Sequence, residues 1–237
     1  MRNVHFIFAW CLTAALSQTT ALSQATQVPA PEDPVAHFGT TVVISTGLRG
    51  QIYFIPPMSQ QLPRFEKLKP VGTIYTTELN VPRHVFDHGF PGVTDRFEWF
   101  AIDYTGDFWI EKPGKYTWGL ASDDGAKLYI DGHTVIDNDG MHVTQGRANV
   151  VKLKRGEHRI RVSYFQGPRY EVSLMLAVIP PGETEFSVFN TDDYLSPQAL
   201  AEWKKSKPDD PQFSGSPRPR RKPADDFVLA PVIPMNP

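Results

Sequence analysis

Apolar and polar residues alternate with a period of two along much of the chain between Leu48 and Ile179. Such alternation is typical of β-strands that bury one face and expose the other. It is clearest in the segments 116–120, 151–154, 159–164 and 172–178. In the last of these, Ser173, Met175 and Ala177 lie opposite the valines and leucines. Because none of these three residues is charged, we expect that strand to be covered on both faces.

Turn-forming dipeptides separate the alternating segments. They are Pro113-Gly114, Asp124-Gly125, Asp131-Gly132 and Arg155-Gly156. Short strands with turns at this spacing predict an all-β sandwich or barrel. One short helix is predicted over residues 196–206, because Ser196 is a good N-cap residue and Pro197 suits the first helical turn.

The composition changes on either side of the strand-rich region. Residues 1–25 place Arg2 before an apolar run that is shorter than the roughly 20 residues of a membrane-spanning helix, and small residues follow. This pattern predicts a secretory signal peptide. The proline-rich residues 26–37 predict an extended linker, and residues 207–237, where prolines are mixed with basic residues, predict a disordered tail. We therefore expect one domain over residues 38–195.

The predicted signal peptide would send the mature chain out of the cytoplasm, to be secreted or periplasmic. Cys11, the only cysteine, lies inside that peptide, so the mature fold would rely on its core without disulfides. We expect no transmembrane segment in the mature chain. The net charge of -2 and the pI near 6.4 argue against nucleic acid as a partner, since phosphate binding needs a concentrated basic face.

Several segments resemble a known family in both order and spacing. They are Tyr104–Phe108 (YTGDF), Gly114–Thr117 (GKYT), Ser122–Gly132 (SDDGAKLYIDG), Gly156–His158 (GEH) and Ile160–Phe165 (IRVSYF). Together they resemble the signature of the anthrax protective-antigen fourteen-kilodalton domain, over roughly residues 48–179. The resemblance implies an antiparallel two-sheet β-sandwich, of a type found in adhesins, bacterial toxins and modules of glycosidases.

The same resemblance points to a calcium site at two adjacent aspartates. In the flocculin and adhesin branch of the family, such a pair binds calcium through a cis peptide bond, and the ion holds sugar hydroxyls. The matching residues here are Asp123 and Asp124. Neighbouring side chains on a regular strand point to opposite faces, so both carboxylates can reach one ion only where the backbone is distorted. The alternative is that Asp-Asp-Gly makes a turn and caps its own amides.

Calcium takes about six to eight oxygen ligands, so two aspartates need additional groups. The adhesin branch has an asparagine in the loop before the last strand, and Gln166 is the nearest candidate for that third metal ligand here. Loops at one end of a sandwich cluster, so Asp139 and His142 are expected on the same rim. Arg169 and Tyr170 could offer a sugar a hydrogen-bond donor and a stacking face.

These observations predict a secreted, calcium-dependent carbohydrate-binding module. Its expected partner is a glycan or cell-surface polysaccharide, with another envelope protein as the alternative. A second interpretation stays open, namely a structural or protein-interaction module of the cell envelope that binds no sugar. We do not expect an enzyme, because adjacent aspartates cannot face each other across a glycosidic bond at roughly 5 to 9.5 Å.

Overall fold

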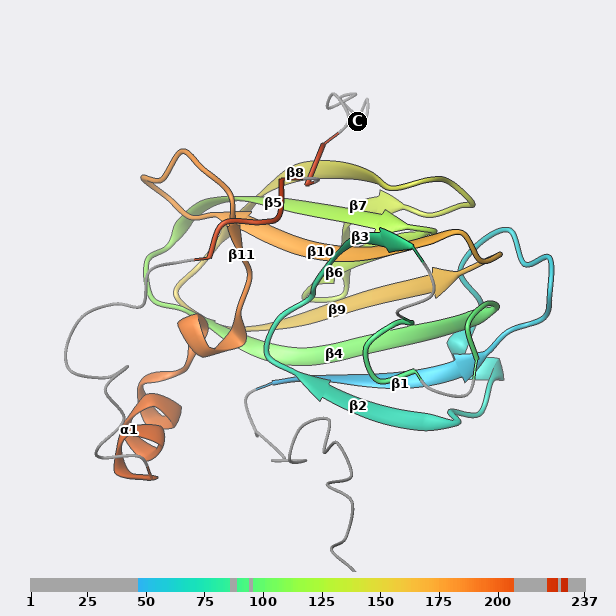
Figure 1. Cartoon of the computed structure of the whole chain (residues 1–237). Helices are drawn as coiled ribbons and strands as arrows, with labels where there is room; N and C mark the ends of the chain where they lie inside the picture. Colours follow the sequence, from blue (N-terminus) through green and yellow to red (C-terminus); the bar gives the residue numbers. More distant parts are fainter. Residues whose placement is uncertain (1–46, 86–88, 94–95, 207–220, 226, 230–237) are drawn as a thin grey trace, which may run out of the picture. The chain divides into compact units, whose positions relative to one another are not determined.

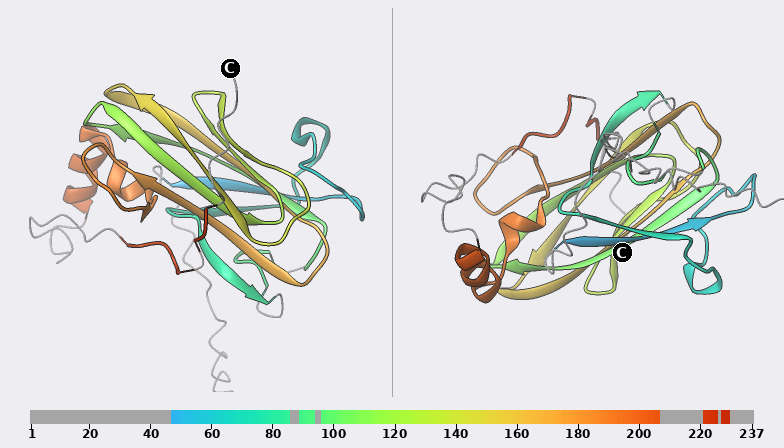
Figure 2. Two further views of the ribbon diagram at one scale, coloured as in Figure 1. Left: turned by 90° about the horizontal axis from the view of Figure 1, so that it is seen from above. Right: turned by 60° about the horizontal axis from the view of Figure 1, so that its bottom comes forward.

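The computed structural model describes residues 47–85, 89–93, 96–206, 221–225 and 227–229. Most of these residues form antiparallel strands in two layers, which Figure 1 shows with their labels and Figure 2 from two other directions. The predicted signal peptide and the linker over residues 26–37 lie outside the described residues. No helix within the described ranges is long and apolar enough to cross a membrane.

The first sheet is built from six of the strands. In chain order these are β1 (Leu48–Phe54), β2 (Gly72–Thr76), β4 (Phe100–Ile110), β6 (Ala126–Ile130), β7 (His133–Asn138) and β9 (Gly156–Gln166). Their order across the sheet is β2-β1-β4-β9-β6-β7, and each neighbouring pair is antiparallel. The long pair β4 and β9 forms the centre of this sheet, with the register Phe100 to Gln166 and Ile110 to Gly156.

The second sheet packs against the first. It contains β5 (Gly114–Asp123), β8 (Gln145–Leu153), β10 (Glu171–Ile179) and β11 (Ser187–Val188), in the order β11-β10-β5-β8, and β3 (Asn80–Val85) also pairs with β10. Two 3-10 turns, η1 (Phe65–Lys67) and η3 (Thr191–Tyr194), and the helix α1 (Pro197–Ser206) complete the described elements. The prediction of an all-β, antiparallel two-sheet sandwich is confirmed.

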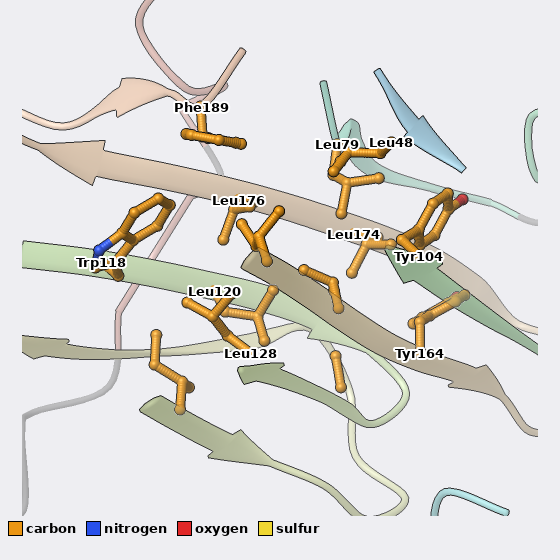
Figure 3. Close-up of a cluster of buried hydrophobic side chains, with 14 of the residues drawn as sticks. Leu48, Leu79, Tyr104, Trp118, Leu120, Leu128, Tyr164, Leu174, Leu176 and Phe189 are labelled. Atoms are coloured by element: carbon orange, nitrogen blue, oxygen red, sulfur yellow. The ribbon is translucent and has the colours of Figure 1, made fainter. Parts of the chain in front are cut away.

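The core follows from the alternation in the sequence. Trp118 and Leu120 on β5 are fully buried, as are Leu128 on β6 and Leu176 on β10. Figure 3 shows these side chains gathered between the strands of the two sheets. Burying side chains of this size contributes roughly 1.5 to 3 kcal/mol each, so this layer is the main source of stability for a domain without disulfides.

The short helix begins where the sequence predicts. Ser196 precedes the first residue of α1, and its hydroxyl oxygen accepts a hydrogen bond of 3.1 Å from the backbone N–H of Ala199. This is the N-cap bond that serine supplies to an otherwise unpaired helical N–H.

The strand β10 is buried on both faces, as its sequence predicts, with Ser173, Met175 and Ala177 no more than 1 % exposed. Part of the cover for this outer face of the five-stranded sheet comes from the C-terminal segment. Phe227 lies over Gly119 of β5, where a Cβ atom would come within 2.7 Å of its ring, and Leu229 forms a parallel bridge with Gly146 of β8.

Part of the predicted disordered tail lies within the described residues. Residues 221–225 and 227–229 contact the domain, whereas residues 207–220 lie outside the described ranges. The N–H of Val188 donates to the carbonyl oxygen of Arg221 at 2.8 Å, and the Arg221 guanidinium pairs with Glu78 at 2.6 Å. These contacts form because the glycines of β5 and β8 leave room for an apolar segment. The proline-rich composition of the segment alone does not predict this packing.

Candidate functional site

The candidate site lies where the chain passes from one sheet to the other. The strand β5 of the five-stranded sheet ends at Asp123, and β6 of the six-stranded sheet begins at Ala126. The peptide bond between Asp123 and Asp124 is cis. Gly125 follows in a place that no side chain could share, because a Cβ atom there would lie 2.5 Å from the Phe165 ring and 2.7 Å from the backbone nitrogen of Gly140.

Both carboxylate oxygens of Asp124 are fixed by main-chain N–H groups from other loops. His142, between β7 and β8, donates to Oδ1 at 3.1 Å, and Gly167, between β9 and β10, donates to Oδ2 at 2.7 Å. Hydrogen bonds to a charged acceptor are shorter and stronger than neutral ones. Asp124 therefore ties two loops to the junction of the two sheets.

Asp123 is held mainly through its backbone. Its carbonyl oxygen accepts a hydrogen bond of 2.7 Å from the hydroxyl of Tyr164, which is fully buried. Its side chain faces Thr144, whose Oγ1 lies 3.5 Å from Oδ2 and whose backbone N–H also interacts with the carboxylate. The carboxylate of Asp123 is thus positioned but not saturated by hydrogen bonds within the described residues.

The two carboxylates lie in a setting that disfavours negative charge. Burial raises the pKa of Asp123 to about 7, and the charges of Asp124 and Glu171 add to the effect. Burial also raises the pKa of Asp124, although the N–H groups of Gly167 and His142 partly oppose this. Within the described ranges, no lysine or arginine forms an ion pair with either carboxylate. A cation at this point would relieve both charges.

Gln166, the predicted third metal ligand, lies at the end of β9 with a fully buried side chain. Its Nε2 is 3.1 Å from the carbonyl oxygen of Glu171 and 3.4 Å from that of Pro168. Its Oε1 lies 2.6 Å from the Tyr164 hydroxyl, whose single proton is shared with the carbonyl oxygen of Asp123. The amide therefore braces the loop after β9 against the same hydroxyl that holds Asp123. Its role as a calcium ligand stays a prediction.

Asp139 and His142 both lie in the loop that follows β7, beside the aspartate pair. Asp139 is occupied with other partners, because its Oδ1 accepts from the N–H of Leu62 at 2.9 Å and its Oδ2 pairs with Lys127 at 3.2 Å. The ring nitrogens of His142 face two main-chain carbonyls, that of Val143 in its own loop at 3.0 Å and that of Asn138 at the end of β7 at 2.9 Å. Their role as sugar contacts stays a prediction.

Arg169 and Tyr170 follow Gly167 in the loop that Asp124 binds. The Tyr170 residue is 83 % exposed and the Arg169 side chain 67 %. The N–H of Arg169 donates to Glu98 Oε2 at 3.2 Å, which attaches this loop to the segment before β4. Both side chains are thus accessible, and they lie two and three residues after Gly167, whose N–H binds Asp124.

A comparison with known protein families shows which family this chain belongs to. The PA14 domain model matches residues 45–192. This chain belongs to the PA14 domain family. The match bears out the resemblance to the protective-antigen domain that the sequence motifs indicate.

Two solved PA14 domains share the fold. The PA14 domain of the MpAFP antifreeze protein has a TM-score of 0.54 and 17 % identity, and the match covers 62 % of this chain and 88 % of that one. A PA14 sugar-binding domain from an RTX adhesin has a TM-score of 0.52 and 18 % identity, covering 62 % and 96 %. At these identities the likeness shows the fold alone. A search of curated proteins finds no match.

The donors of this PA14 domain suit a hard cation in kind, since carboxylate and carbonyl oxygens are the ligands that calcium prefers. These donors are too few to complete a calcium site by themselves. Among the residues that the structure describes, no three His, Cys, Asp or Glu side chains gather into a metal site. An ion held by Asp123 and Asp124 would need further oxygens from main-chain carbonyls, an amide or the ligand itself.

Sequence reasoning missed three residues that position the aspartate pair, namely Thr144, Tyr164 and Gly167. Gly167 could have been identified from the sequence, because a glycine between Gln166 and Pro168 in a loop allows close approach to another group. A Cβ atom there would lie 2.8 Å from Asp124 Oδ2. Tyr164 could not have been identified as a site residue, because the alternation along β9 identifies it only as a core residue.

Proposed function

We propose that this PA14 domain is an exported, calcium-dependent carbohydrate-binding module, with the ion held by Asp123 and Asp124. The supporting observation is a pair of adjacent aspartates that, as whole residues, are only 7 % and 6 % exposed, and whose carboxylates have no positively charged partner among the described lysines and arginines. Two buried like charges are costly unless they are protonated or share a cation. A hard divalent cation with oxygen ligands is the partner that such a pair favours.

The residues around the pair would orient it for that role. The N–H groups of His142 and Gly167 hold both oxygens of Asp124, and Tyr164 holds the backbone of Asp123. When bound, calcium supplies coordination positions that sugar hydroxyl oxygens can fill. Arg169 and Tyr170 would contact the rest of the sugar, because both are exposed on the loop fixed by Asp124. Asp139 and His142 would border the site from the opposite loop.

The expected partner is a glycan or cell-surface polysaccharide. The RTX adhesin domain with the same fold is described as sugar-binding, which supports this class of ligand. Export rests on the signal-peptide pattern of residues 1–25 and belongs to the same proposal. An envelope protein remains the alternative partner.

One observation favours the second candidate function, a structural or protein-interaction module without sugar binding. Both groups of the Gln166 amide are engaged within the fold, by Tyr164 and by the carbonyls of Pro168 and Glu171. On this interpretation the aspartate pair serves to bind the loops of one end together, and no sugar is bound there.

A glycan array probed with the mature chain separates the two functions. We expect binding to one class of glycan in about 1 mM calcium and loss of that binding in excess EDTA. Asp123→Asn should lose the same signal, whereas Glu111→Gln should keep it, because Glu111 pairs with Arg155 on an exposed strand end. Binding of no glycan by a chain that has been shown to bind calcium would favour the structural function.

A further inference from the structure

A separate cavity of about 550 Å³ lies on the outer face of the six-stranded sheet. Its floor is formed by neighbouring strands, since Thr105 on β4 is opposite Arg161 on β9, which is in turn opposite Tyr129 on β6. The turn η1 contributes Phe65 to its wall, and β1 contributes Tyr53. None of its lining residues belongs to the loops around the aspartate pair. Its volume lies in the range of small-ligand sites, roughly 300 to 1,000 Å³.

Arg161 is held in place on the floor of this cavity. Its guanidinium carbon lies 5.6 Å from the ring centre of Phe65 and 5.2 Å from that of Tyr129. Its Nε donates to Asp103 Oδ1 at 2.7 Å. An arginine held by two rings and a carboxylate loses little further freedom when a ligand binds, so its remaining N–H groups are preorganised.

Asp103 is fixed in the same way. Its Oδ1 accepts a second hydrogen bond, from Ser163 Oγ at 2.8 Å, and its side chain is 13 % exposed. No described residue donates to its Oδ2, and none accepts from the terminal amino groups of Arg161. The cavity therefore has a carboxylate acceptor and a pair of guanidinium donors beside each other.

We propose that this cavity is a second ligand site, which binds a neutral sugar ring without a metal ion. A hydroxyl both donates and accepts, so adjacent hydroxyls of a sugar satisfy Asp103 and Arg161 at once. Two carboxylates, Asp103 and Glu66, and two arginines, Arg159 and Arg161, line the cavity, so its charges balance and a net charge on the ligand gains no attraction. The rings of Tyr129, Phe65 and Tyr53 supply the apolar surface on which the C–H face of a sugar packs.

Chemical-shift mapping on the ¹⁵N-labelled mature chain tests this site in excess EDTA, which removes any calcium. The neutral probes are lactose, cellobiose and maltose, and the charged probes are glucuronic acid and glucosamine. We expect at least one neutral disaccharide to shift the amide signals of Thr105, Tyr129 and Arg161, with a Kd of about 1 mM. We expect the two charged sugars to bind there about tenfold more weakly or not at all.

Two variants locate the binding. Thr105 is an exposed strand residue that lines the cavity, so Thr105→Tyr should fill the space and abolish the shifts without a change in the core. Val150→Tyr, at an exposed position of β8 in the other sheet, is the matched control and should leave them unchanged. Arg161→Lys keeps the charge but loses the planar fork, and should weaken binding about tenfold.

The proposal is overturned if no neutral probe shifts these three amides at about 20 mM, if Thr105→Tyr leaves the shifts intact, or if glucuronic acid or glucosamine binds there more tightly. Shifts confined to the loops around Asp123 and Asp124 would also overturn it. Because the aspartate pair is tested with calcium and this cavity without, failure of one proposal is distinguishable from failure of the other.

Discussion

The backbone N–H of Gly167 donates a hydrogen bond of 2.7 Å to Oδ2 of Asp124, joining the loop after β9 to the junction of the two sheets. This contact needs a glycine, because a Cβ atom at residue 167 would lie 2.8 Å from the same oxygen. The glycine at position 167 thus lets the loop that carries Arg169 and Tyr170 attach to Asp124.

We expect Gly167→Ala to push this loop away from Asp124 and to weaken the hydrogen bond. Loss of a bond to a charged acceptor should lower the free energy of unfolding by about 1.5 to 3 kcal/mol. Urea denaturation measures the change. Gly72→Ala is a suitable control, because a Cβ atom there would meet only Ile52 at an ordinary 3.5 Å. Equal effects of the two substitutions would argue against the close contact.

The raised pKa of Asp123 predicts how stability depends on pH in the absence of metal. The folded value is about 7 and the ordinary value 3.8, so the folded chain holds the proton more tightly than the unfolded chain. The resulting stabilisation is fully present below about pH 4 and is lost as the pH rises through about 7. In EDTA, the stability advantage of Asp123→Asn over the unmodified chain should therefore grow across this interval.

Denaturation of both chains at a series of pH values checks this. The comparison between them cancels the contributions of titrating groups that do not interact with Asp123. A difference that stays constant from about pH 4 to about pH 7 would contradict the assignment of the raised pKa to Asp123.

Phe227 gives the C-terminal segment a measurable role in stability. Its ring packs edge-on against Phe186 with centroids 5.4 Å apart, and it lies over Gly119 of β5. We expect Phe227→Ala to lower the free energy of unfolding by about 1 to 3 kcal/mol, because the ring is only partly buried. Hydrogen exchange should also increase at Met175 and Ala177. Val228→Ala, at a position that is 66 % exposed, should change little, and similar losses in both variants would mean that Phe227 does not anchor the segment.

The sequence pattern predicts the sandwich well because the pattern and the burial have the same cause. Alternation along β5, β9 and β10 reflects which side chains face the other sheet, and the uncharged outer face of β10 correctly indicates a second cover. What provides part of that cover, Phe227, is about fifty residues away in sequence. Local composition predicts disorder there, because the glycine that receives the ring, Gly119, lies on β5, far away in sequence.

The sequence singles out the aspartate pair at the centre of the candidate site but not the contacts of the residues around it. Asp123 and Asp124 are found from a family motif, and their role as metal ligands stays a prediction. Asp139 illustrates the limit, because its partner is the backbone N–H of Leu62, 77 residues away. No sequence motif predicts that contact, because it depends on how the segment before η1 packs against the sheet. The sequence does not predict the outer cavity with Arg161 either, because residues far apart in the chain form that cavity.

A calorimetric titration of the mature chain with calcium tests the central claim most directly. We predict that one ion binds per chain, with a Kd between about 1 µM and 1 mM, and that Asp123→Asn and Asp124→Asn each weaken binding at least about tenfold. Glu111→Gln should bind as the unmodified chain does, because its carboxylate pairs with Arg155 elsewhere. Absence of calcium binding by the folded, unmodified chain, or unchanged binding in both Asn variants, would contradict the assignment of the ion to Asp123 and Asp124.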